Sequence, residues 1–280
     1  MPQTFRYVVI DVFTDTPLEG NQLAVFTDAR ELPEALMQPL AREIGFSETV
    51  FVHPSQAAHA RIRIFTPSAE LPFAGHPTLG TAFVLGQPMQ LDTIALETGS
   101  GVVPVRLERE GPKVVFGRMD QPIPSIEPFE EAPLLESLGV GRSELPVELY
   151  DNGMRHVYVA LADEDAVASL EPDLKALARY GRTIGFNCFA GAGARWKTRM
   201  FAPGESMPED PATGSAAGPL AVHLARHGRI AWGDEIVISQ GAEIGRPSTL
   251  YARAEGSAER IDRIEVGGSA VVVARGEFRL

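Results

Sequence analysis

The sequence predicts an α+β protein of two domains, and three observations carry this prediction. Segments with a strand pattern outnumber those with a helix pattern, and few of them alternate as strand–helix–strand, which favours α+β over a doubly wound parallel sheet. The length of 280 residues suits two domains of roughly 100–200 residues each. The composition, 44% hydrophobic and 22% charged, is ordinary for a globular chain that buries a core of its own.

The first part of the chain predicts mostly strands. The β-branched and aromatic run Tyr7–Phe13 is typical of a strand. Apolar residues at four-residue spacing predict an amphipathic helix over 33–44 that ends at Gly45, although Pro39 inside it favours a kink or a split. Further strands are predicted over 49–52, 60–65, 93–97, 102–107 and 113–117, with a second helix over 77–85.

The proline-broken stretch 122–133 is the most linker-like part of the chain. After it the sequence predicts helices over 172–179 and 211–227, and strands over 155–161, 196–201, 235–239, 248–254, 260–265 and 270–278. We therefore expect an N-terminal domain over 1–118, onto which the C-terminal strand can pack back, and a C-terminal domain over 119–280.

Charge and cysteine content exclude several classes of function. The 25 Lys and Arg against 37 Asp and Glu give a net charge of −12, which argues against binding of nucleic acid. The single cysteine, Cys188, excludes an internal disulfide, a cysteine-rich metal site and chemistry that needs two thiols in one chain. The sequence starts without a leader pattern and has no apolar run long enough for a membrane span. We expect a cytoplasmic protein without nucleic-acid or membrane partners.

Two segments, 65–82 and 201–216, resemble each other. Both run from a strand, through a proline-bearing loop, into a helix with small residues in its first turns. Aligned at an offset of 210 − 76 = 134, they pair His76 with Asp210 and Gly80 with Gly214. A duplicated domain would carry two equivalent helices whose N-termini could face a common cleft and bind a carboxylate. The alternative is chance, because a polar cap followed by proline is common at helix starts.

Acid/base side chains occur at the same places. Asp210 and His76 stand at the two helix starts, and Glu48 lies between a helix stop and a buried strand, where a carboxylate could be partly desolvated and suited to proton transfer. Each also has an ordinary explanation: a helix cap, a buried hydrogen-bonded histidine and a solvated glutamate. His223 and His227 are four residues apart on a helix, but no third ligand is suggested, so we expect no metal.

Longer motifs run in order along the chain. They are Asp11-Val12-Phe13-Thr14, Gly20-Asn21-Gln22-Leu23-Ala24-Val25-Phe26, Ser47-Glu48-Thr49-Val50-Phe51-Val52, Phe65-Thr66-Pro67, Glu70-Leu71-Pro72-Phe73-Ala74-Gly75-His76-Pro77-Thr78-Leu79-Gly80, Glu209-Asp210-Pro211-Ala212-Thr213-Gly214-Ser215-Ala216, and Gln240-Gly241 with Gly245-Arg246-Pro247-Ser248. Together they resemble the PhzF-like (phenazine-biosynthesis-type) isomerases.

The resemblance implies the diaminopimelate-epimerase-like fold. In that fold two pseudo-equivalent lobes each wrap a curved or barrel-like, mostly antiparallel sheet around a central helix, and the active site lies at the N-termini of those helices. Related racemases use one cysteine from each lobe. This chain has Gly75-His76 and Asp210-Pro211 at those entrances and no cysteine, so two-thiol racemisation is excluded.

The resemblance also implies the function. Glu48 would be the general acid/base that moves a proton between carbons of a small carboxylate-bearing substrate, with His76 and Asp210 as its catalytic partners and no cofactor. The implied substrate-binding residues are Gly75, Thr213, Gly214, Ser215 and Asn21. A homodimer is expected by family analogy. Two other functions stay open: an amino-acid racemase or epimerase, and a non-catalytic protein that binds small carboxylates.

Overall fold

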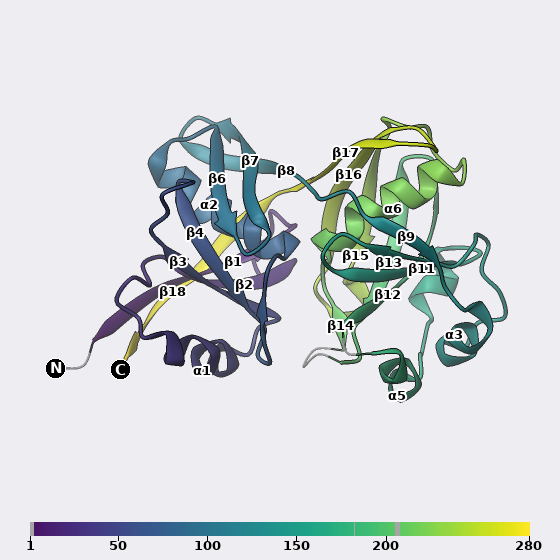
Figure 1. The fold of residues 1–280 in the computed structure, drawn as a ribbon, viewed down its shortest axis with the longest axis horizontal. Helices are drawn as coiled ribbons and strands as arrows, with labels where there is room; N and C mark the ends of the chain where they lie inside the picture. Colours follow the sequence, from purple (N-terminus) through teal and green to yellow (C-terminus); the bar gives the residue numbers. More distant parts are fainter. Residues whose placement is uncertain (1–2, 182, 205–207) are drawn as a thin grey trace. The chain divides into compact units, whose positions relative to one another are not determined.

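The computed structural model describes residues 3–181, 183–204 and 208–280. Contacts divide the chain into two compact units (Figure 1). Unit 1 comprises Met1–Asp120 and Gly267–Leu280, and unit 2 comprises Gln121–Val266. The C-terminal strand β18 (Ala270–Arg279) belongs to unit 1 because it pairs with β1 (Thr4–Val12). Within the described residues, no helix is both long and apolar enough to cross a membrane.

Unit 1 wraps a mixed sheet around one helix. Its strands pair in the order β18–β1–β2–β3–β4–β6–β7–β8; the pairs β2–β3 and β4–β6 are parallel, and the others in unit 1 are antiparallel. The helix α2 (Gly75–Met89) contacts strands on all sides, and its first nine residues are buried. The remaining elements of unit 1 are β2 (Asn21–Phe26), α1 (Glu34–Ile44), β3 (Glu48–His53), β4 (Ala60–Phe65), β5 (Glu70–Leu71), β6 (Thr93–Thr98), β7 (Gly101–Glu110) and β8 (Lys113–Asp120).

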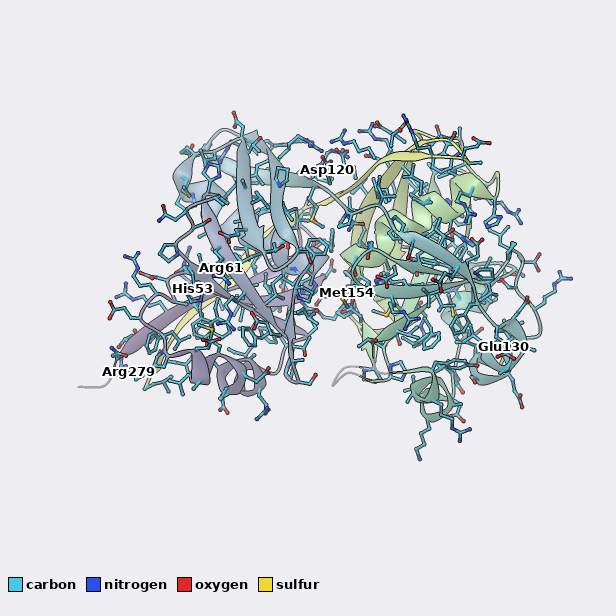
Figure 2. The ribbon with its side chains drawn as sticks, in the orientation of Figure 1. His53, Arg61, Asp120, Glu130, Met154 and Arg279 are labelled. Atoms are coloured by element: carbon cyan, nitrogen blue, oxygen red, sulfur yellow. The ribbon has the colours of Figure 1, made fainter. Side chains whose placement is uncertain are left out.

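The helix α1 connects the parallel strands β2 and β3. It ends at Gly45, whose φ of 72° is the left-handed conformation that glycine adopts without strain. Pro39 lies inside α1 without splitting it, contrary to the expected break, and the helix packs Met37, Leu40 and Ala41 against Phe26 and Phe51. Strand β3 then runs from Glu48 to His53, and His53 lies opposite Arg61 at the end of the β3–β4 pair remote from Glu48 (Figure 2).

Unit 2 has the same arrangement around α6 (Gly214–Arg226), which is buried over Gly214–Ala225. Its strands pair in the order β9–β10–β11–β12–β13–β15–β16, with β11–β12 and β13–β15 parallel. Its other elements are β9 (Ser125–Pro128), α3 (Glu131–Leu138), β10 (Glu148–Asp151), β11 (Arg155–Ala160), α4 (Glu164–Ala168), α5 (Leu174–Leu177), β12 (Ile184–Ala192), β13 (Arg195–Phe201), β14 (Glu209–Asp210), β15 (Glu235–Gln240), β16 (Ser248–Gly256) and β17 (Ile261–Gly268), which continues into unit 1.

Two local predictions for unit 2 need correction. The stretch 122–133 is more than a linker, because β9 within it pairs with β10. The helix expected over 172–179 is only the four residues Leu174–Leu177, followed by a 3₁₀ turn, Ala178–Tyr180, which ends at Gly181 with a φ of 127°. The predicted α+β class, with a sheet curved around a helix, is confirmed.

The strand pairings support a duplication but correct its alignment. From β1 to β7 and from β10 to β16, corresponding pairs are antiparallel, parallel, antiparallel, parallel and antiparallel. The short strands and the helix starts both give an offset of 139, as 209 − 70 and as 214 − 75. The counterpart of His76 is therefore Ser215, and that of Asp210 is Leu71. The sequence alignment matched Pro77 with Pro211 and so used an offset of 134 in place of 139. Residues 205–207 of the second segment lie outside the described residues.

Both units place the same ion pair just before the central helix. In unit 1, Arg63 of β4 donates to both carboxylate oxygens of Glu70 at 2.7 Å; in unit 2, Arg199 of β13 does the same to Glu209 at 2.8 Å. Each guanidinium also stacks on the phenylalanine two residues along its own strand, at 5.3 Å and 5.0 Å from the ring centre. This clamp holds β5 and β14 on their neighbours and so sets where the chain enters each helix.

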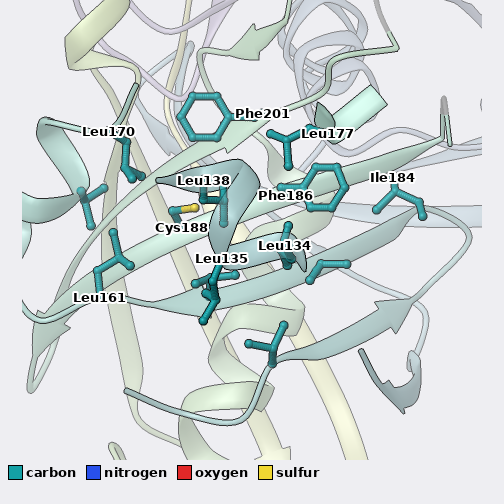
Figure 3. Close-up of a cluster of buried hydrophobic side chains, with 14 of the residues drawn as sticks. Leu134, Leu135, Leu138, Leu161, Leu170, Leu177, Ile184, Phe186, Cys188 and Phe201 are labelled. Carbon is teal, nitrogen blue, oxygen red and sulfur yellow. The ribbon is translucent and has the colours of Figure 1, made fainter. Parts of the chain in front are cut away.

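The two clamps differ in burial. The side chains of Arg199 and Glu209 are 9% and 12% exposed, against 18% and 41% for Arg63 and Glu70. Arg199 also donates to the carbonyls of Val167, Ala168 and Leu170 at the end of α4, where a helix leaves its acceptors unpaired. The apolar core of unit 2 contains Cys188 together with Leu138, Phe186 and Phe201 (Figure 3).

Loss of the unit 2 clamp is expected to cost more stability than loss of the unit 1 clamp. Arg199→Met leaves Glu209 as a buried charge without its partner, which lowers the free energy of unfolding by about 3–5 kcal/mol. Arg63→Met removes the pairs with Glu70 and with Glu34, whose side chains are 41% and 76% exposed, with a loss of about 1 kcal/mol or less. Urea unfolding followed by circular dichroism measures both, and equal losses would contradict the assignment.

Candidate active site

The candidate site in unit 1 is where β3 begins beside the start of α2. Glu48 is the first residue of β3 and pairs with Leu23 of β2, so the turn after α1 delivers its carboxylate to this end of the sheet. His76 is the second residue of α2, and Pro77 is tolerated there because the first turn needs no N–H. The His76 Nε2 lies 3.4 Å from Glu48 Oε2, with the two side chains 5% and 16% exposed.

His76 is uncharged near neutral pH. Complete burial lowers the pKa of His76 to about 3, and a hydrogen bond to the Gln22 backbone opposes this only in part. The Nδ2 of Asn21 lies 3.3 Å from His76 Nδ1, and the hydroxyl of Ser47 donates to Asn21 Oδ1 at 3.0 Å. The imidazole is therefore held in a fixed orientation beside a carboxylate that retains some access to solvent.

This arrangement suits proton transfer. A partly desolvated carboxylate can take a proton from a weakly acidic carbon, and a neutral imidazole beside it offers one N–H donor and one acceptor without adding charge. The sequence prediction placed Glu48, His76 and Asn21 at one site, and all three lie together here. Gly75 is the first residue of α2, with its backbone in the turn that carries unpaired N–H groups.

In unit 2, Asp210 does not cap the helix as the sequence suggested. It lies in β14, and Thr213 is the residue at the cap position of α6. The Thr213 hydroxyl donates to Asp210 Oδ2 at 2.6 Å. Gln240, at the end of β15, accepts from the Thr213 N–H and donates to the Asp210 carbonyl, so its amide joins the strand to the helix entrance.

Ser215 is the second residue of α6, directly after Gly214. Its Oγ lies 3.0 Å from Nε2 of His156, a residue of β11 that is 2% exposed. Burial lowers the pKa of His156 to about 4, with Asp151 opposing this weakly, so His156 is neutral as well. Sequence reasoning missed His156 and Ser47: His156 stands in an apolar strand with no motif around it, and Ser47 was quoted only as part of a motif. Gln240 also lay in a quoted motif.

The two units differ where the duplication would place the carboxylate. Strand register makes Gly185 the counterpart of Glu48, because each lies one residue before the partner of the clamp phenylalanine. By the same register His156, opposite Gly185, is the counterpart of Leu23, opposite Glu48. The acid/base pair of unit 1 therefore has no second copy: unit 2 offers a serine and a histidine in its place.

A second polar cluster in unit 2 involves the expected histidine pair. Glu148 supplies the third ligand type that the sequence did not suggest, and its ligand atom lies within 4.8 Å of those of His223 and His227. The same Glu148 Oε2, however, accepts from Tyr150 at 2.9 Å and from Arg226 at 2.9 Å as well as facing both histidines. The guanidinium of Arg226 at that oxygen repels a cation, so the cluster is best explained as a hydrogen-bond network centred on Glu148.

Two of the buried histidines, His76 and His156, predict a loss of stability in acid. In the unfolded chain a histidine titrates near 6.5, whereas the folded protein holds the pKa of His76 at about 3 and that of His156 at about 4. Stability is therefore full above about pH 6.5 and falls as the pH drops toward 4. His156→Leu should make the loss shallower by about 1.4 kcal/mol per pH unit. Chemical unfolding at a series of pH values tests this, and an unchanged slope would contradict it.

Comparison with known proteins shows to which family the chain belongs. A family model described as "Phenazine biosynthesis-like protein" matches residues 10–276. The trans-2,3-dihydro-3-hydroxyanthranilate isomerase of Pseudomonas fluorescens is 52% identical, over 98% of this chain and 99% of the relative.

Solved structures are similar to this chain in fold. A phenazine biosynthesis protein of the PhzF family from Bacillus anthracis has a TM-score of 0.84 at 27% identity, covering 99% of both chains. A hydroxyproline epimerase from Agrobacterium vitis has a TM-score of 0.68 at 11% identity, covering 99% of this chain and 91% of the other, which shows a shared fold. The expected resemblance, fold and enzyme class are thus confirmed: the chain belongs to the phenazine biosynthesis-like family of PhzF-like isomerases.

Proposed function

We propose that the protein isomerises trans-2,3-dihydro-3-hydroxyanthranilate, or a small carboxylate much like it, by moving a proton between two carbons without a cofactor. The supporting observation is the contact of Glu48 with the neutral His76 at the buried start of α2. The relatives with more than half of their residues identical carry this substrate in their names.

The proposed reaction uses one carboxylate twice. Glu48 takes a proton from a C–H bond of the substrate, the electron pair passes into the conjugated system, and the protonated Glu48 returns a proton to a second carbon. Protons and electrons balance without an outside reagent. His76, held by Asn21, donates or accepts a hydrogen bond where charge shifts on the substrate. Acid/base assistance of this kind supplies about 10²–10⁴-fold, and positioning must supply the rest.

Unit 2 supplies the proposed groups for the substrate's polar parts. The first turn of α6 at Gly214 and Ser215 presents N–H groups and a hydroxyl, which suits a carboxylate. Asp210, fixed by Thr213, would accept from a hydroxyl or amine of the substrate. By analogy with the family we also propose a carboxylate-bearing substrate, a homodimer and a cytoplasmic location.

Two other functions have less support. A racemase of the two-thiol type needs an ionisable cysteine, but the one cysteine, Cys188, is fully buried in the core of unit 2, and burial raises the pKa of its thiol to about 12. A protein that only binds carboxylates has no use for Glu48 beside its ligand, because a nearby negative charge weakens such binding.

Glu48→Gln should abolish turnover. The amide keeps the size and polarity of the side chain but cannot take a proton, so the rate should fall by at least about 10²-fold. Conversion of trans-2,3-dihydro-3-hydroxyanthranilate, followed by absorbance or proton NMR, measures it. The matched control is Glu43→Gln at an exposed position of α1, which should leave the rate unchanged. A Glu48→Gln enzyme within tenfold of the original would sink the mechanism.

Cys188→Ala should leave turnover unchanged apart from a modest loss of stability. The thiol lies in the core and is not available as a base. Incubation with amino acids in deuterated water gives the second readout, for which we expect no exchange at the α-carbon. Exchange in the original protein that disappears in Cys188→Ala would favour the racemase.

A further inference from the structure

Ser215 has a buried partner for which the proposed mechanism has no role. Its Oγ lies 3.0 Å from Nε2 of His156, and the two residues are 6% and 2% exposed. The hydrogen bond between a serine and a histidine can run in either direction, and the two directions have different chemical consequences. If the serine donates to the ring it becomes a nucleophile, whereas if the ring donates to the serine the hydroxyl proton stays free for another acceptor.

Asn187 decides between these two arrangements. Its Nδ2 lies 3.4 Å from the carbonyls of Val157 and Gly185 and 3.4 Å from His156 Nδ1. Two carbonyl neighbours identify this atom as the amide nitrogen, because an oxygen there would face two other oxygens. An amide nitrogen cannot accept a hydrogen bond, so a proton on Nδ1 would face it without an acceptor, and Nδ1 is the unprotonated ring nitrogen. A neutral ring then carries its proton on Nε2, and that N–H points to Ser215 Oγ.

The local backbone makes room for this ring only in unit 2. A Cβ at Gly185 would lie 3.0 Å from His156 Nδ1 and 3.0 Å from the sulfur of Met200, so any side chain there would displace the histidine or the methionine. At the equivalent places unit 1 has Glu48 and Leu23. The absence of a side chain at Gly185 thus leaves the space that the ring of His156 occupies.

We propose that His156 is a positioning residue that donates its Nε2 proton to Ser215 Oγ and makes Ser215 a dedicated hydrogen-bond donor to an anionic oxygen of the substrate. The proposal rests on the proposed function, and it specifies the ligand group as a carboxylate or similar oxyanion. A hydroxyl that accepts one hydrogen bond is a stronger donor of the next, and its rotation is restricted before the substrate arrives. Burial keeps His156 neutral, so the ring adds no charge.

The first test needs no substrate. Nitrogen-15 NMR of the full chain labelled at histidine reports which ring nitrogen carries the proton. We expect Nε2 of His156 to be protonated and Nδ1 to be bare at neutral pH, with the Nε2–H resonance shifting in Ser215→Ala. A proton on Nδ1 would overturn the proposal, since Ser215 would then donate to the ring. This result stands even if the protein does not turn over the named substrate.

The second test is a double-mutant cycle on turnover. Ser215→Ala should raise KM by about 10- to 100-fold with kcat little changed, because a bond to a charged group is lost in ground and transition states alike. His156→Leu, which places the unit 1 residue in unit 2, should raise KM about tenfold. The double variant should match Ser215→Ala alone, and His156→Gln, which keeps an N–H donor, should recover most of the loss.

The control for stability is Val157→Ala. Val157 is the next residue on β11, belongs to the apolar core on the other side of the sheet and is fully buried. It should destabilise unit 2 with no change in KM, which separates positioning from a general loss of structure. If the increases in KM caused by His156→Leu and Ser215→Ala multiplied in the double variant, the proposal would be overturned. No turnover by the original protein would instead refute the proposed function and leave the NMR test to decide on His156.

Discussion

A helix enclosed by strands on all sides has to satisfy the polar groups of its first turn without help from water. This constraint governs both α2 and α6, whose first residues are buried. The first N–H groups of a helix have no acceptor one turn earlier in the helix, so other groups must meet them. Gln240 supplies one such partner in unit 2 by accepting from Thr213. The remaining donors form a natural site for an anion.

The entry to each helix depends on the strand pair before it. The Arg–Glu clamps hold β5 against β4 and β14 against β13, and the chain then turns directly into the helix. Because this device is repeated with the same stacking on phenylalanine, it gives both units the same geometry at the point where His76 and Ser215 project. The clamps do no chemistry, yet they fix the backbone on which the reactive residues stand.

Divergence within this common frame separates the roles of the units. Unit 1 has a carboxylate, Glu48, beside a neutral histidine on the helix, and this pair suits the proposed proton transfer. Unit 2 has Gly185 at that position, and the space is used by a histidine on the strand that faces a serine on the helix. The proposed one-base reaction requires only one such carboxylate, and unit 2 has Gly185 at the corresponding position.

The sequence by itself determined the α+β class and the family, and it indicated a duplication and a set of candidate site residues, because strand patterns and long motifs are local signals. Glu48, His76 and Asn21, which the motifs single out, lie in contact in the folded chain.

Only the tertiary structure decided the register of the duplication, and with it that Ser215 rather than Asp210 is the counterpart of His76. Equivalence in a folded chain is set by strand pairing across many residues, whereas matching prolines can be shifted by a few positions. Distance along the chain also explains why the sequence did not single out His156 and Gln240. Their partners Ser215 and Thr213 are 59 and 27 residues away, and no local sequence pattern indicates such contacts.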